Sequence, residues 1–149
     1  MDSPKPARIL LVEDNPDDVE ITRRALSRGR VGHEVWVARD GQEALEFLHR
    51  RGAHAESPRP DLVLLDVNLP RRTGLEVLEE IKADAGLRTL PVIVLTSSRR
   101  DEDVERAYFL GANTYFTKPV GFEEFFRVVT TIRDYWIVNA TLPLAEARP

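Results

Sequence analysis

The chain contains no cysteine among its 149 residues, which excludes disulfides, thiolate metal sites and cysteine nucleophiles. It also lacks any apolar run close to the roughly 20 residues that a membrane-spanning helix needs. The segment 1–7 holds prolines and no apolar stretch, so it has none of the features of a secretory signal peptide. These absences favour a cytoplasmic protein that does not enter a membrane.

A surplus of basic residues is missing as well. Lysine and arginine together number 21 against 25 aspartates and glutamates, which gives a net charge of −4. A nucleic-acid-binding domain more often carries a basic surplus on one face. The glycine-rich and Walker A motifs of nucleotide-binding proteins are also absent. We therefore expect neither a nucleic acid nor a nucleotide as ligand.

Short apolar runs alternate with segments of helical period, a pattern typical of an α/β domain with a parallel sheet. The expected strands are residues 8–12, 34–38, 61–65, 91–95 and 114–117, and the expected helices are residues 16–28, 41–52, 74–84, 100–110 and 121–137. This order predicts a flavodoxin-like (βα)5 fold, with a doubly wound five-stranded parallel sheet in a single domain. The predicted boundaries are a disordered N-terminus at 1–7, the domain at 8–137 and a short C-terminal extension at 138–149.

Capping signals mark where the helices begin. Asn15 offers an N-cap, and Pro16 follows it at the first helical position. Three further pairs have capping-box spacing: Asp40 with Glu43, Thr73 with Glu76 and, more weakly, Ser98 with Asp101. The first four helices are expected to stop at glycines in the left-handed conformation: Gly29, Gly52, Gly86 and Gly111.

Polar residues stand at the ends of four apolar runs. Glu13 and Asp14 follow the first strand, Asp66 follows the third, Thr96 ends the fourth and Lys118 follows the fifth. The carboxyl ends of parallel strands share one edge of a sheet, where ligands of this architecture bind. We therefore expect the three carboxylates, the hydroxyl and the ammonium to meet in one pocket.

This set of side chains suits a divalent cation and a phosphoryl group. Clustered carboxylates repel one another unless a cation joins them, and oxygen ligands without histidine or cysteine favour Mg²⁺ or Mn²⁺ over zinc. Asp66 can attack a phosphoryl group, while Lys118 and Thr96 can stabilise its charge. Each residue alone has a simpler interpretation, such as helix capping for Glu13 and Asp14, but their common position favours the site.

The residues that follow these strands carry a family resemblance. The chain resembles the receiver domains of two-component response regulators over about residues 7–137. The matching elements, in order, are Leu11-Val12-Glu13-Asp14-Asn15, Leu64-Leu65-Asp66-Val67-Asn68-Leu69-Pro70, Gly74, Leu95-Thr96-Ser97, Gly111-Ala112 and Lys118-Pro119. Each motif alone is weak, but all of them in this order are highly specific.

The resemblance implies a role for each site residue. Asp66 would accept phosphate from a sensor histidine kinase, with Thr96 and Lys118 completing the catalytic set. Mg²⁺, for which Mn²⁺ substitutes, would be held directly by Asp14, Asp66 and the backbone carbonyl of Asn68, with Glu13 acting mainly through water. Thr96 and Tyr115 would form the switch, and Asn68 and Ser98 would tune the phosphate lifetime. Such a protein is not a metabolic enzyme; it catalyses its own phosphorylation and dephosphorylation.

The chain is most similar to single-domain regulators that accompany phytochrome-type histidine kinases, on the evidence of residues 12–19, 48–60 and 135–143. No effector domain follows, so protein contact is the expected output. The last helix has a predicted core stripe of Phe122, Phe125, Val129, Ile132 and Trp136. We expect a homodimer through this helix and the extension, involving Phe126, Tyr135, Trp136 and Ile137. Packing of these residues under the tail is the alternative.

Three competing functions are weighed. A Mg²⁺-dependent phosphatase would need a second acid two residues after Asp66, and Asn68 occupies that position. A receiver-like interaction module without phosphotransfer is disfavoured by the complete polar set. A transcription-factor fragment is disfavoured because the tail is a poor linker. The sequence does not identify the cognate kinase, its signal, the output partner, the phosphate lifetime or any effect of phosphorylation on dimerisation.

Overall fold

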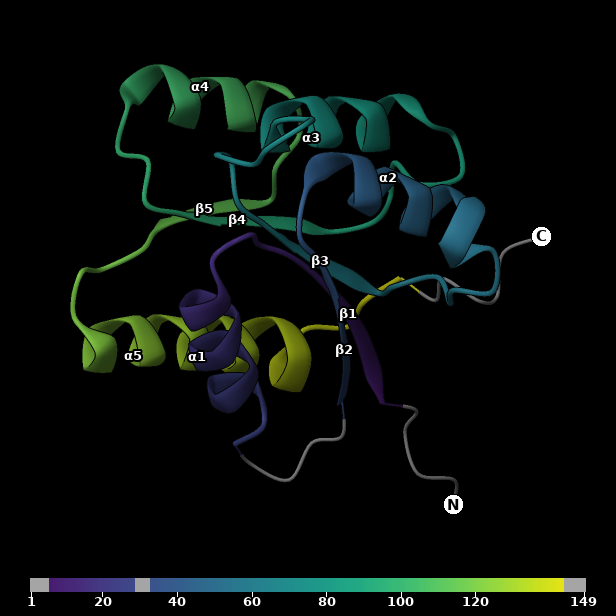
Figure 1. The fold of residues 1–149 in the computed structure, drawn as a ribbon. Coiled ribbons are helices and arrows are strands. Elements are labelled where there is room, and N and C mark those ends of the chain that lie inside the picture. Colours follow the sequence, from purple (N-terminus) through teal and green to yellow (C-terminus); the bar gives the residue numbers. More distant parts are fainter. Residues whose placement is uncertain (1–5, 29–32, 144–149) are drawn as a thin grey trace.

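The computed structural model describes residues 6–28 and 33–143, in which strands and helices alternate along the chain (Figure 1). The strands are β1 (Ala7–Val12), β2 (His33–Ala38), β3 (Leu62–Leu65), β4 (Val92–Thr96) and β5 (Thr114–Thr117). The helices are α1 (Pro16–Leu26), α2 (Gly41–His49), α3 (Gly74–Ala83), α4 (Asp101–Phe109) and α5 (Phe122–Ile132), with a 3-10 turn η1 (Gly52–His54) and a π-helical segment η2 (Arg133–Asn139). The predicted elements are all present, with ends that differ by up to five residues.

The five strands form one parallel sheet in the order β2-β1-β3-β4-β5. The flavodoxin-like fold is therefore confirmed. The strand order reverses between β1 and β3, and ligands bind at the carboxyl ends of strands at such a switch point. In the β1–β3 register Val12 pairs with Leu65. The next residues along the two strands, Glu13 and Asp66, consequently emerge side by side.

Helices cover both faces of the sheet: α1 and α5 lie on one face, and α2, α3 and α4 lie on the other (Figure 1). Alternate residues of each strand divide between the two cores. In β1, Leu10 and Val12 join the core under α2 and α3, while Ile9 and Leu11 join the core under α1 and α5. Because both faces are buried, β1, β3 and β4 read as almost unbroken apolar runs.

The capping signals fix most of the helix starts. The Asn15 side chain accepts hydrogen bonds from the backbone N–H groups of Asp17 and Asp18, at 2.9 and 3.2 Å. Thr73 and Glu76 form a reciprocal capping box, with both hydrogen bonds at 3.2 Å. The Ser98 prediction is wrong, because α4 takes Arg100 as its N-cap and the Ser98 hydroxyl donates to Asp103 at 2.6 Å.

The helix ends follow the predicted glycines only in part. Gly111 has the expected left-handed backbone (φ 107°) after α4. Helix α2 stops earlier, at Arg50, which is itself left-handed (φ 56°), and Gly52 adopts φ 58° two residues later. The prediction for Gly86 is wrong: α3 ends in extended backbone at Asp84, whose carboxylate accepts the Gly86 N–H at 2.7 Å. Gly29 lies outside the described residues.

The last helix is longer than predicted and packs differently. It continues as η2 to Asn139, two residues beyond the expected end. Phe122 is 55% exposed and does not belong to the core stripe. The stripe consists of Phe125, Val129 and Ile132, which are buried. Trp136 is only partly buried against the same core, as are its neighbours Phe126, Val128, Ile137 and Leu142.

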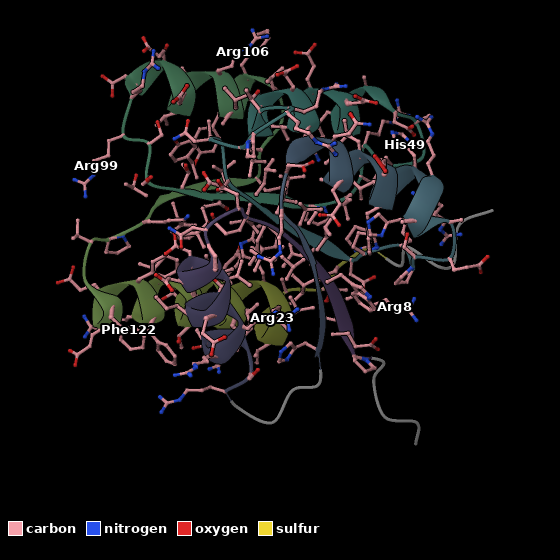
Figure 2. The ribbon with its side chains drawn as sticks, in the orientation of Figure 1. Arg8, Arg23, His49, Arg99, Arg106 and Phe122 are labelled. Carbon is pink, nitrogen blue, oxygen red and sulfur yellow. The ribbon has the colours of Figure 1, made fainter. Side chains whose placement is uncertain are left out.

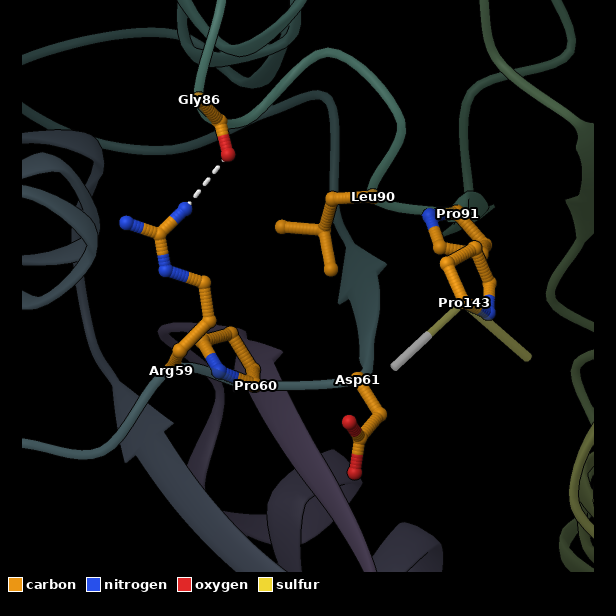
Figure 3. A pocket seen from close by; sticks show the side chains of 7 residues that line it. All are labelled: Arg59, Pro60, Asp61, Gly86, Leu90, Pro91 and Pro143. Carbon is orange, nitrogen blue, oxygen red and sulfur yellow. Dashed lines mark hydrogen bonds between the residues drawn. The ribbon is translucent and has the colours of Figure 1, made fainter. Parts of the chain in front are cut away.

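The tail crosses the edge of the sheet where the strands begin. Pro143 lies beside Pro91, which precedes β4, in a small pocket that also contains Arg59 and Asp61 (Figure 3). The Arg59 guanidinium closes this pocket by donating to the Gly86 carbonyl at 2.6 Å. The pocket lies opposite the carboxyl edge and takes no part in the predicted site. Among the described residues, no helix has both the length and the apolarity to cross a membrane.

Candidate functional site

The backbone of the sheet fixes the positions of the site residues. The Asp66 N–H donates to the Val12 carbonyl at 3.1 Å, and the Lys118 N–H donates to the Thr96 carbonyl at 2.7 Å. These hydrogen bonds extend the strand pairing by one residue past the strand ends. They place Asp66 beside Glu13 and Lys118 beside Thr96, so that all four side chains start from one edge of the sheet.

Lys118 lies at the centre of this edge. Its side chain is 6% exposed, and its ammonium donates to three carboxylates: Glu13, Asp18 at 2.9 Å and Asp66 at 3.1 Å. A buried ammonium is stable only when it is paired and hydrogen-bonded, and here every proton has an acceptor. The lysine therefore joins segments that are more than fifty residues apart in the chain.

The Asp66 carboxylate is held at both oxygens. The Thr96 hydroxyl donates to Oδ1 at 2.6 Å, and the backbone N–H of Asn68 donates to the same oxygen at 3.1 Å. Lys118 contacts the other oxygen. A group that bonds to Asp66 would consequently meet a hydroxyl donor and an ammonium at once. This is the arrangement that phosphoryl transfer needs, because that chemistry depends on positioning and on charge stabilisation.

Three carboxylates form a candidate metal site next to Lys118. Glu13, Asp14 and Asp66 each offer one oxygen, and these oxygens lie within 4.8 Å of one another. Glu13 and Asp66 are buried while Asp14 is exposed, so the group opens to solvent on one side. Oxygen donors without nitrogen or sulfur fit a hard cation such as Mg²⁺ or Mn²⁺.

The electrostatics of the site reflect an excess of negative charge among its side chains. Burial, together with the neighbouring Asp66, raises the pKa of Glu13 to about 7 against the opposing hydrogen bond from Lys118. Burial by itself would lower the pKa of Lys118, but Asp66, Glu13 and Asp18 outweigh burial and raise it. Lys118 is therefore a firmly charged cation that three acids share. A second cation would relieve the remaining repulsion.

Gly74, one of the motif residues, is required by the backbone around Asp66. A Cβ atom at this position would lie 2.0 Å from the Asp66 carbonyl oxygen and 2.8 Å from the Val67 Cα. The Gly74 N–H also donates to the Val67 carbonyl at 2.8 Å, which draws α3 against the loop that carries the aspartate. Only glycine permits this close approach.

The predicted switch residues are linked through the loop after β4. The Tyr115 hydroxyl donates to the Ser98 carbonyl at 3.0 Å, and its ring packs partly buried against the core under α2, α3 and α4. The Ser98 N–H approaches the Thr96 hydroxyl oxygen at 3.4 Å. A continuous path of contacts thus leads from Asp66 through Thr96 to Tyr115.

Two further residues contact the site. The side chain of Asn68 is exposed, and the residue meets Asp66 through its backbone N–H. Asp18 is not among the predicted site residues, yet it is the third carboxylate that accepts from Lys118. Asp14 precedes the Asn15 cap and is not part of α1, so no helical spacing relates Asp14 to Asp18.

The site faces the loops that leave the carboxyl ends of the strands. In Figure 2 the labelled Arg99, in the loop after β4, and Phe122, at the start of α5, flank this edge of the sheet. A groove of about 250 Å³ lies against the edge and is lined by Asp18, Ser97 and Lys118 together with the segment 119–122. The groove adjoins the site through Lys118, whose ammonium contacts Asp66.

Comparison with known proteins places the chain in a family. Residues 9–130 match the model of the response regulator receiver domain. Response regulator Rcp1 of Synechocystis sp. is 42% identical over 144 residues, which cover 97% of this chain and 98% of that protein. The probable methanogenesis regulatory protein FilR2 of Methanothrix harundinacea is 42% identical over 138 residues, which cover 92% of this chain and 88% of that protein.

Solved structures agree with these relatives. The phosphorylated cyanobacterial phytochrome response regulator RcpA superposes with a TM-score of 0.91 at 43% identity, over 94% of this chain and 100% of that one. The Mn²⁺-bound form of Rcp1 gives 0.91 at 42% identity, over 93% and 100% of the two chains. With the matched fold and the acidic edge of the sheet, these likenesses show that the chain belongs to the response regulator receiver domain family.

Proposed function

We propose that this receiver domain accepts a phosphoryl group on Asp66 and thereby switches a protein-interaction surface. The contacts of Asp66 carry the proposal: one oxygen accepts from the Thr96 hydroxyl and the other from the Lys118 ammonium, beside two further carboxylates. Phosphorylation of the similar RcpA supports it. An interaction module that accepts no phosphate would have no need to bury an ammonium among acids.

In the proposed reaction a carboxylate oxygen of Asp66 bonds to phosphorus while the bond from phosphorus to the donor nitrogen breaks. The bonding electron pair leaves with the donor imidazole, and the product is an acyl phosphate. Lys118 and Thr96 stabilise the phosphoryl oxygens as charge develops on them. Mg²⁺ bound by Glu13, Asp14, Asp66 and the backbone carbonyl of Asn68 would supply two further positive charges.

The proposed switch depends on Thr96 and Tyr115. An oxygen of the phosphoryl group would replace the Asp66 oxygen as acceptor of the Thr96 hydroxyl, and the loop at Ser98 would follow. Tyr115, bonded to the Ser98 carbonyl, would turn further inward as that loop moves. Phosphate must favour one of the two states by such differential contacts. Asn68 and Ser98, which lie two positions after Asp66 and Thr96, are the proposed determinants of phosphate lifetime.

The proposed donor is a sensor histidine kinase of the phytochrome type, and the proposed location of this receiver domain is the cytoplasm. The names of RcpA and of the bacteriophytochrome response regulator AtBRR support this choice, the latter at 44% identity and a TM-score of 0.71. Both of those chains are matched over their full length, so the likeness is not confined to the acidic motifs.

Metal dependence tests the proposed function. With acetyl phosphate and Mg²⁺ or Mn²⁺, the intact mass of the protein should rise by one phosphoryl group per chain. Excess chelator should abolish the gain, because three clustered carboxylates repel an anionic donor without a cation. The control is the same protein with Ca²⁺, which prefers more ligands at longer distances and should support uptake poorly. Equal uptake in chelator would refute the metal role.

A homodimer through the last helix and the tail is the remaining part of the proposal. Its support is the exposure of Tyr135 (62%) and Val138 (47%) on η2. Phe126, Trp136 and Ile137 contribute less surface than expected, because they pack partly against the core of their own chain. Sedimentation at micromolar concentration should show a dimer in at least one phosphorylation state. A monomer in both states would end this part of the proposal.

A further inference from the structure

Asp18 differs from the other two carboxylates that bind Lys118. Glu13 and Asp66 belong to the group of oxygens that faces the candidate metal site, and Asp18 does not. Its Oδ2 atom accepts from the Lys118 ammonium at 2.9 Å, a shorter contact than the 3.1 Å between that ammonium and Asp66. A cation in the metal site therefore competes for two partners of Lys118 and leaves the contact with Asp18 intact.

The position of Asp18 is fixed independently of Lys118. The residue lies in the first turn of α1, and its backbone N–H donates to the Asn15 cap at 3.2 Å. The helix dipole also favours a carboxylate in the first turn, which is where Asp18 lies. Lys118, in contrast, has a long flexible stem. In this pair Asp18 is held in place, and Lys118 is the group that has to move when its ammonium turns toward a phosphoryl group.

Asp18 also lies at the groove that leads to the site. Its side chain is 22% exposed, whereas that of Lys118 is 6% exposed, and both line the groove of about 250 Å³. A donor that enters there meets a negative charge before it meets the ammonium. Asp18 therefore opposes an anionic donor in two ways. It repels the donor directly, and it binds the Lys118 ammonium, which would otherwise attract the donor.

We propose that Asp18 is a positioning residue for Lys118 that slows phosphorylation of Asp66 by small anionic donors. The inference rests on the proposed function and adds a determinant of donor choice to it. A phosphoryl group presented by a protein surface can bring cationic groups to offset Asp18, and free acetyl phosphate cannot. With acetyl phosphate, an Asp66 oxygen bonds to phosphorus as the bond to the acetate oxygen breaks, and acetate leaves with the electron pair.

The size of the effect follows from Coulomb's law. Unit charges about 6 Å apart change an equilibrium or a rate by a factor on the order of ten at an effective dielectric constant of about 40, between the values for a protein surface and for water, and salt weakens the interaction. Asp18→Asn keeps the shape of the side chain and removes its charge. We therefore expect this variant to react with acetyl phosphate about tenfold faster than the unsubstituted protein at low ionic strength.

The test measures rates of uptake from acetyl phosphate as a function of salt. Asp17→Asn is the matched control, because Asp17 is the preceding first-turn acid, is exposed and does not contact Lys118. Added salt should accelerate the unsubstituted protein and Asp17→Asn, and it should leave Asp18→Asn nearly unchanged. Asp18→Glu should keep the slow rate, since it keeps the charge. Asp18→Ser replaces Asp18→Asn if the latter fails to fold.

Three results would overturn the inference: a rate for Asp18→Asn equal to or below that of the unsubstituted protein, the same gain in Asp17→Asn, or an unaltered salt dependence. A role in folding alone would lower the rate and would not flatten its response to salt. Failure of the proposed function looks different, because the unsubstituted protein would then take up no phosphate at all. In that case the inference fails with it.

Discussion

Asp66→Asn protein should take up no phosphoryl group from acetyl phosphate and Mg²⁺ under conditions that load the unsubstituted chain. The amide nitrogen is not a nucleophile, and the amide oxygen is too weak a one to replace a carboxylate. The fold should survive, because the amide oxygen of the substituted side chain can still accept from the Thr96 hydroxyl. Lys118 keeps Glu13 and Asp18 as partners. Intact-mass spectrometry measures the uptake.

The matched control for this substitution is Asp101→Asn. Asp101 is an exposed first-turn acid of α4 and is outside the acidic group at the sheet edge. It should be loaded like the unsubstituted protein, since the substitution removes the same charge at a distance from the site. Uptake that persists in Asp66→Asn, or that is lost equally in Asp101→Asn, would contradict the assignment of Asp66 as acceptor.

Lys118→Met should destabilise the metal-free protein by about 3 kcal/mol at pH 8, since removing one partner of a buried ion pair costs about 3–5 kcal/mol. Methionine fills the volume of the lysine stem but leaves Glu13 and Asp66 buried without a cation. The loss should also slow phosphoryl uptake on the order of 100-fold, because one of the charges that stabilise the transferring group is gone. Urea unfolding measures the first effect and mass spectrometry the second.

The pH dependence of this destabilisation follows from Glu13. Its pKa in the folded protein is raised to about 7 from 4.5, and loss of Lys118 can only raise it further. A carboxyl group with a raised folded-state pKa stabilises the fold below its unfolded pKa and loses that contribution as the pH rises through the folded value. The cost of Lys118→Met should therefore be smaller at pH 5 than at pH 8.

A double variant identifies the source of the cost. Lys118→Met combined with Glu13→Gln removes one of the unpaired buried charges, so at pH 8 it should be more stable than Lys118→Met alone. The two substitutions are in direct contact, and their effects should be strongly non-additive. If Lys118→Met alone lowered the free energy of unfolding by less than about 0.5 kcal/mol, solvent or local rearrangement would be neutralising the acids. That result would contradict the buried cluster described above.

The convergence of the site could be predicted from the sequence because it depends on the backbone alone. Glu13, Asp66, Thr96 and Lys118 each stand at the end of an apolar run, and parallel strands bring such ends together. The roles of these residues came from the family resemblance. Their hydrogen bonds are known only from the structure. There Lys118 donates to Glu13 and Asp66, which belong to the candidate metal site, and to Asp18, which does not.

The features that the sequence did not predict depend on how far side chains extend and on which of several nearby groups they bond to. Asp18 in α1 contacts Lys118 in the loop after β5, and no spacing along the sequence predicts that contact. Ser98 looks like an N-cap, but Asp103 takes its hydroxyl as a donor and the helix starts later. Phe122 has the helical spacing of a core residue, yet it lies at the exposed end of α5, past the edge of the sheet.

The most direct measurement is the chemical identification of the phosphorylated residue. The protein is loaded with acetyl phosphate and Mg²⁺, the acyl phosphate is trapped by borohydride reduction, and the peptides are sequenced by mass spectrometry. The account predicts modification at Asp66 alone, and none when chelator replaces Mg²⁺. Modification at Glu13, Asp14 or a residue outside the acidic edge, or none at any carboxylate, would contradict it.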